Sequence, residues 1–159
     1  MTGANIKNII LAVFAAIGGF FVEFLGGVDG ALKVLIIFMF VDYITGLAVA
    51  FVFHRSTKTT SGGASSKEGF KGIVKKLCII MLVGLAHEID VIMGVEYMRA
   101  TAMLFFIGNE GLSVLENVGL MGVKYPEFLK KALEVMRDKG EKEIQNAECG
   151  MRSDKGEKL

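Results

Sequence analysis

The stretch Ala31–Phe53 is long and apolar enough to cross a lipid bilayer as one helix. A helix rises about 1.5 Å per residue and the hydrocarbon core is about 30 Å thick, so a span needs about 20 mostly apolar residues. The stretch holds one charge near its start, Lys33, and one at its centre, Asp42. It therefore predicts a transmembrane helix that carries a carboxylate at membrane depth.

Three further segments are nearly as apolar, although each contains ionisable residues. The overall hydrophobic content of 52% decides little, because soluble chains come close to it, but here the apolar residues are gathered in blocks. We expect an all-α integral membrane protein whose transmembrane domain covers residues 1–123. It would be a bundle of four transmembrane helices, or of three if the first lies along the membrane surface. The expected helices are 6–28, 31–53, 77–95 and 97–118.

The distribution of Lys and Arg predicts the orientation of these helices. The segment 54–72 is rich in Ser, Thr, Gly and Lys, which predicts a solvated loop. Together with Lys75 and Lys76 it holds six of the 18 basic residues, whereas the other connections hold almost none. The positive-inside rule then places this loop and the C-terminus in the cytoplasm, as a multi-pass topology. Four spans would leave the N-terminus inside as well, and three would leave it outside.

A polar region follows the single proline, Pro126. Apolar residues recur at helical spacing among charged ones just after it, which predicts an amphipathic cytoplasmic helix over 124–138. The segment 139–159 is polar, spaced by glycines and mixed in charge, so we expect it to be disordered.

Ionisable side chains inside apolar helices cost roughly 2.5–3.5 kcal/mol each on insertion scales, so they normally face a partner or water. Asp42 shares a helix face with Gly46 and Ala50, where a second helix can approach closely. This face is either a helix-packing contact or a pore or oligomer contact, and the two roles are compatible. Glu23 continues a stripe of small residues in the first helix, for which packing is favoured over lining a pore. The stripe comprises Ala12, Ala15, Ala16, Gly19 and Gly27.

The third segment ends with His87, Glu88 and Asp90, a group that could suggest a metal site. The only other histidine, His54, lies in the predicted loop, so we expect no metal and assign the group to a wet end of the bundle. The fourth segment has a polar stripe within an arc of about 120° at 100° per residue. Its members are Arg99, Asn109, Glu110, Ser113, Glu116 and Asn117. The stripe is either a seam buried in the monomer, paired with the His87–Asp90 group, or the wall of an aqueous lesion.

Enzymatic motifs are not evident in the sequence. No nucleophile elbow, phosphate-binding glycine loop, paired histidine ligands or Cys-x-x-Cys pattern occurs, so we expect neither catalysis nor a cofactor. The net charge of +1 gives no reason to expect a nucleic-acid partner. Cys78 and Cys149 lie far apart in unlike surroundings and read as reduced thiols.

Three blocks in order resemble a known family. The segment 41–47, VDYITGL, resembles the Asp-Tyr-x-Thr-Gly signature of the toxin-secretion and phage-lysis type of phage holin, a group that includes the holin-like protein of clostridial toxin loci. The stretch 65–76 is similar to that family's Ser-, Gly- and Lys-rich segment. The segment 106–117, FIGNEGLSVLEN, is similar to its most recognisable block, and the likeness continues through Pro126 to Leu133.

The resemblance implies a protein that accumulates in the bacterial cytoplasmic membrane and associates with copies of itself in the lipid bilayer. It then opens lesions through which an endolysin or a large toxin leaves the cell. In such an assembly Asp42 and the stripe from Asn109 to Asn117 would form helix–helix contacts. Some of these side chains would face water once the lesion opens. Two alternatives remain: an antiholin-like inhibitor of the same family, and a small ion channel or transporter subunit.

Overall fold

The computed structural model describes residues 3–59 and 61–156 of the chain, and the side chains of residues 6–59 and 61–146. This part is all-helical, without strands, as the sequence predicted. The helices are α1 (Gly3–Phe24), α2 (Gly30–Ala48) with a π-helical continuation η1 (Val49–Phe53), α3 (Ser66–Met93), α4 (Met98–Leu120) and α5 (Glu127–Gly156). The loop predicted over 54–72 is shorter than expected, because α3 already begins at Ser66.

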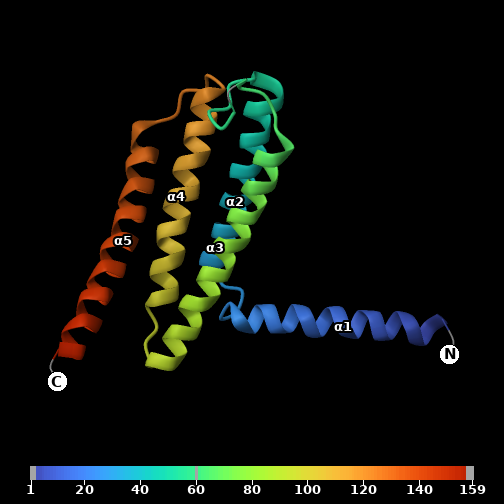
Figure 1. Cartoon of the computed structure of the whole chain (residues 1–159), viewed down its shortest axis with the longest axis vertical. Coiled ribbons are helices and arrows are strands. Elements are labelled where there is room, and N and C mark those ends of the chain that lie inside the picture. Colours follow the sequence, from blue (N-terminus) through green and yellow to red (C-terminus); the bar gives the residue numbers. More distant parts are fainter. Residues whose placement is uncertain (1–2, 60, 157–159) are drawn as a thin grey trace.

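Helices α2 to α5 lie side by side as an up-and-down bundle, and α1 projects sideways from its end (Figure 1). Helix α4 is central, because it contacts α2, α3 and α5. The arrangement differs from the expected four-span bundle, which includes the first helix, and from both expected versions in that the C-terminal helix packs on the bundle. The physical reason is local: α1 reaches the bundle only near its end, where Phe24 packs on Gly84, whereas α5 fits closely along α4.

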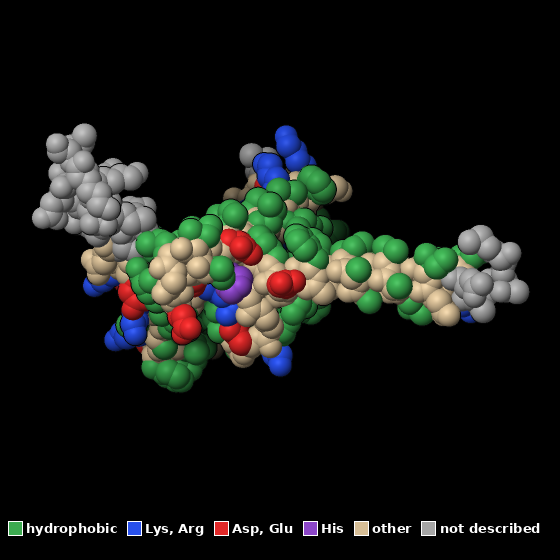
Figure 2. Space-filling view, turned by 90° about the horizontal axis from the view of Figure 1, so that it is seen from below, with side chains coloured by type: hydrophobic (Ala, Val, Ile, Leu, Met, Phe, Trp, Pro, Cys, Tyr) green, Lys and Arg blue, Asp and Glu red, His purple; other side chains and the backbone are tan. Residues whose placement is uncertain are grey.

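The apolar core lies between α2, α3 and α4. Its buried members are Leu25, Leu32, Leu35, Met39, Ile79, Val83, Met103 and Ile107. Many other large apolar side chains point outward, including Phe14 of α1, Phe40 of α2 and Leu77 of α3, which are 69%, 66% and 58% exposed. Figure 2 shows hydrophobic side chains over much of the bundle end that it views and at intervals along α1. Apolar exposure on this scale suits a lipid surrounding rather than water.

Two helical segments are long and apolar enough to cross a membrane: Ile6–Phe24 and Gly30–Phe53, with mean hydropathies of 1.8 and 2.3. The first is not buried at all in the bundle, and the second is 22% buried. Helices α3 and α4 carry more polar residues along their length, and in α4 the polar side chains of Thr101, Glu110 and Asn117 are buried.

The C-terminal helix is longer than the sequence predicted. Helix α5 begins directly after Pro126 and continues to Gly156, through most of the segment 139–159 that was expected to be disordered. Residues 157–159 lie outside the described part. The contacts with α4 explain the difference, since Gly140 packs against Phe105 and the Thr101 hydroxyl donates to Glu143 Oε2 at 2.7 Å. Contacts of this kind stabilise a helix that its own sequence would leave unstable.

Candidate functional site: a charged network inside the bundle

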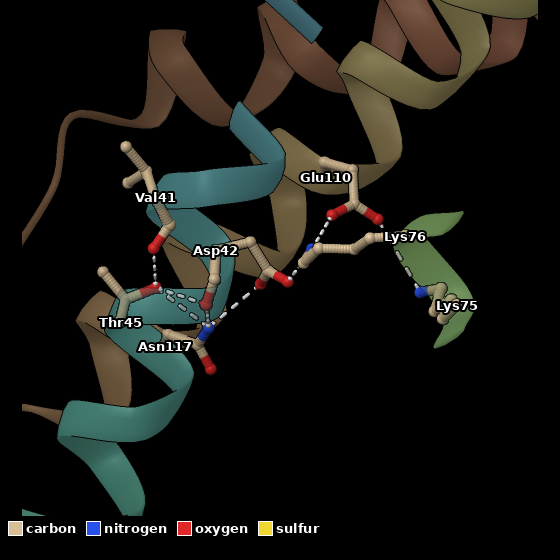
Figure 3. Close-up of polar contacts among 7 residues, drawn as sticks. All are labelled: Val41, Asp42, Thr45, Lys75, Lys76, Glu110 and Asn117. Atoms are coloured by element: carbon tan, nitrogen blue, oxygen red, sulfur yellow. Dashed lines mark hydrogen bonds and ion pairs between the residues drawn. The ribbon is translucent and has the colours of Figure 1, made fainter. Parts of the chain in front are cut away.

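Three charged side chains from three helices meet inside the bundle (Figure 3). Lys76 of α3 extends its Nζ to within 2.7 Å of Asp42 Oδ2 on α2 and also contacts Glu110 Oε2 on α4. The Glu110 side chain is only 1% exposed. Lys75 approaches the same carboxylate at 3.8 Å from the surface side. Two carboxylates and two ammonium groups thus gather in one place, with no net charge.

Polar groups of α2 and α4 complete the network. Asn117 Nδ2 donates to Asp42 Oδ1 and to Thr45 Oγ1, both at 3.1 Å. The Thr45 hydroxyl donates in turn to the carbonyl oxygen of Val41 at 2.9 Å. Among the described residues, no buried polar side-chain atom lacks a partner. The network is therefore fully satisfied, which is the condition for a polar cluster to persist in an apolar interior.

The network lies near the middle of the bundle's height. Asp42 is twelve residues after the start of α2 at Gly30, and Glu110 is twelve after the start of α4 at Met98, which is about 18 Å of helix in each case. Buried ion pairs of this kind contribute little net stability, but breaking one is costly because a charge is left without a partner. We therefore expect the network to favour one particular register of the three helices.

The structure brings together some of the predicted site residues and separates others. Glu110 and Asn117 meet Asp42, and a Cβ on Gly46 would lie 3.7 Å from the Asn117 amide. The polar stripe of α4 is thus partly a seam within the monomer, but its partners are Asp42 and Lys76 rather than the His87–Asp90 group. The remaining members lie outside the network: Ser113 lines a neighbouring pocket, Asn109 is half-buried and Glu116 is exposed.

Lys76 is the member that sequence reasoning missed. Because Lys76 follows Lys75 at the end of a polar stretch, the sequence predicted that it belongs to the cytoplasmic loop. The available signal was chemical: two acidic residues in apolar helices require a cation, and Lys75 and Lys76 are the basic residues next to the predicted third span.

A second polar cluster joins the helix connections at the opposite end of the bundle. Arg99 donates to the carbonyl oxygens of Leu25 and Gly27 at 2.6 and 3.0 Å, and its Nη1 lies 2.5 Å from Asp29 Oδ2. Hydrogen bonding from the Leu32 backbone N–H, followed by the Arg99 guanidinium, lowers the pKa of Asp29. Arg99 therefore clamps the α1–α2 turn and does not belong to the polar network of α4.

Asp90 and His87 also have structural places at this end. The Asp90 carboxylate accepts from the backbone N–H groups of Met98 and Arg99, both at 2.9 Å, and so caps the start of α4. His87 packs against Gly26, where a Cβ would lie 2.6 Å from the imidazole Nδ1. Glu23 is exposed on α1. In the described part of the chain, no three His, Cys, Asp or Glu side chains gather as metal ligands would.

Known proteins match this chain over most of its length. The sequence model of the bacteriophage holin family matches residues 19–138. An uncharacterised protein of Listeria monocytogenes is 43% identical over 117 residues, which are 73% of this chain and 78% of that protein. A 14.9 kDa protein of Clostridium perfringens is 34% identical over 142 residues, 85% of this chain and 98% of its own.

A named viral protein is among the relatives. The probable holin of Bacillus phage phi105 is 32% identical over 106 residues, which cover 66% of this chain and 73% of the phage protein. No solved structure matches the chain. The family match covers the network residues and confirms the resemblance of the three sequence blocks. The chain belongs to the bacteriophage holin family.

Proposed function

We propose that this chain acts as a holin: it accumulates in the bacterial cytoplasmic membrane, associates with copies of itself and opens lesions that release an endolysin or a large toxin. Family membership and the similarity to a probable phage holin support this role, and they point to a membrane protein rather than an enzyme. The structural observation that carries it is the Asp42–Lys76–Glu110 network, sealed inside a bundle whose helices α2 and α3 expose many large apolar side chains.

The network suits a protein that changes between two packings. In the closed monomer each charge has a partner, so the helices can present apolar surfaces to lipid. In an oligomer the same side chains can exchange their partners for water along a lesion wall. Packed helices switch between discrete arrangements rather than deforming gradually, which accords with a sudden opening.

Lysis timing tests this proposal. We expect Asp42→Asn or Glu110→Gln to advance the onset of lysis, because the closed bundle loses an ion pair while the helices keep their shape. The measurement is culture turbidity after induction of each variant together with an endolysin, compared with each protein expressed alone. Glu116→Gln is the matched control, since it removes a carboxylate from the same helix at an exposed position outside the network.

The outcomes separate the candidate functions. If both network variants lyse cells at the unchanged time, the network has no role in the opening of the lesion. Delayed lysis when the chain is added to an active holin would indicate an antiholin-like inhibitor. Ion flux without release of a folded cytoplasmic enzyme would indicate a channel or transporter subunit.

Helix α1 is our candidate for the contact between copies. It is apolar on all sides, and its small-residue stripe is not covered by the bundle; an added Cβ at Gly18 or Gly19 would meet nothing within 4 Å. Small residues at this spacing favour close helix association in lipid. We expect Gly19→Leu, on the stripe, to lower the yield of chemically cross-linked oligomers severalfold. Gly18→Leu, one position off the stripe, is the control, and equal loss in both variants would contradict the assignment.

The cytoplasmic placement of the C-terminus requires α5 to move. In the structure α5 begins at the loop end of the bundle and runs along α4 to the opposite end (Figure 1). If α4 crosses the bilayer, a helix as charged as α5 cannot remain beside it at membrane depth without a large desolvation cost. We propose that the docked α5 belongs to the state before opening and that α5 leaves α4 when α4 takes its place in the membrane.

A further inference from the structure

A pocket with both charged and apolar lining residues opens beside the charged network at the loop end of α2 and α3. Its volume is about 100 Å³, and its lining includes Lys58 of the loop and Lys75 of α3. The acidic groups in the lining already have close partners: Asp42 lies 2.7 Å from Lys76, and Glu68 lies 2.7 Å from Lys71.

The two remaining cations in the lining, Lys58 and Lys75, have no acidic partner at close range within the described part of the chain. Lys58 forms no ion pair within the described part of the chain, and Lys75 has only the 3.8 Å approach to Glu110, whose nearer partner is Lys76. The Lys75 side chain is 63% exposed, so it is free to reorient. The mouth of the pocket is therefore positively charged and open to an anion.

An apolar groove continues from this pocket along the outside of α2 and α3, which lie side by side (Figure 1). It holds about 350 Å³, within the range of about 300–1,000 Å³ typical of small-molecule sites. Ile36 and Phe40 of α2 face Ile73, Leu77 and Ile80 of α3 across it. Tyr43 and Lys76 line both the pocket and the groove, so the two spaces are joined.

The two spaces together have the shape and polarity of a membrane lipid. Since α2 and α3 are antiparallel, Ile36 and Ile80 both lie farther from the loop than Tyr43 and Lys76 do. The charged end thus points to the loop and the apolar end points into the bundle's apolar belt. We propose that this is a binding site for an anionic phospholipid, with the phosphate held by Lys58 and Lys75 and an acyl chain in the groove. The proposal rests on the membrane location in the proposed function, but not on lesion formation.

Lipid retention by the full chain, purified in detergent, tests the site. Native mass spectrometry would compare phosphatidylglycerol with phosphatidylcholine of the same acyl chains, and we expect the anionic lipid to be retained preferentially. The double variant Lys58→Gln/Lys75→Gln should lose roughly tenfold or more of that preference, as expected for two lysine–phosphate contacts. Lys67→Gln, a loss of one positive charge in the first turn of α3 outside the pocket, should leave it unchanged.

The groove has its own pair of variants. Ile36→Trp should fill the groove and lower retention of both lipids, whereas Ile37→Trp, at the next position and outside the groove, should not. Millimolar inorganic phosphate should not displace the lipid, because it cannot use the groove. Equal retention of the two lipids, loss in Lys67→Gln equal to that in the double variant, or full displacement by phosphate would each overturn the proposal. Because retention is measured without lysis, its failure is distinguishable from failure of the holin role.

Discussion

Replacing Lys76 by methionine is expected to destabilise the folded bundle by about 3–5 kcal/mol, the range found when one partner of a buried ion pair is removed. Lys76 is the close cation for both Asp42 and Glu110, and Glu110 is almost completely buried. Without the ammonium group the two carboxylates must take up protons or draw in water. Helix content followed by circular dichroism during heating in detergent measures the loss, since the chain has no tryptophan to report on unfolding.

A triple variant makes the prediction specific to charge. Adding Asp42→Asn and Glu110→Gln to Lys76→Met removes all three charges, and we expect most of the lost stability to return. Neutral replacements of similar volume for a buried ion cluster are often as stable as the original or more stable. If the single variant Lys76→Met melts like the native chain, or if the triple variant remains as unstable as the single one, the network does not hold the helices together by charge pairing.

Substituting leucine for Gly108 is expected to separate α5 from α4. A Cβ at Gly108 would lie 2.6 Å from the backbone nitrogen of Arg137 and 2.8 Å from the carbonyl oxygen of Leu133. Backbone atoms cannot turn aside as a flexible side chain can, so the overlap costs about 1–3 kcal/mol or more unless α5 lifts away. We expect trypsin to cleave the basic residues of α5 several times faster in this variant, as measured by mass spectrometry of the fragments.

Gly119→Leu is the matched control for this change. It makes the same substitution on the same helix at an exposed position, where a Cβ would meet only Tyr125, at an ordinary 3.5 Å. Both variants replace a helical glycine of α4 by leucine, and only Gly108 faces the backbone of α5, so faster cleavage in Gly108→Leu alone reports the α4–α5 contact. If α5 restrains the opening step, Gly108→Leu should also advance lysis. Equal protease resistance in the two variants would show that α5 is not held by this contact.

The local features of the helices could be predicted from the sequence. The helix predicted over 31–53 corresponds to α2 and η1, and that over 97–118 to α4, because the hydropathy of a continuous segment is a local property of the chain. Less local features were missed. The start of α3 at Ser66 escaped prediction because its first turns are polar, and the length of α5 because it depends on contacts with α4.

The presence of acidic groups in apolar helices, and the need for each to find a partner, follow from the sequence and from the low polarity of the interior alone. Which partner each one finds does not. Lys76 is 34 residues from Asp42 and 34 from Glu110, a separation at which no periodicity of a single helix relates side chains. Only the way in which α2, α3 and α4 pack sets the rotation and height of each helix, and with it the place where the three charges meet. The same packing places α5 against glycines of α4 and leaves α1 outside the bundle.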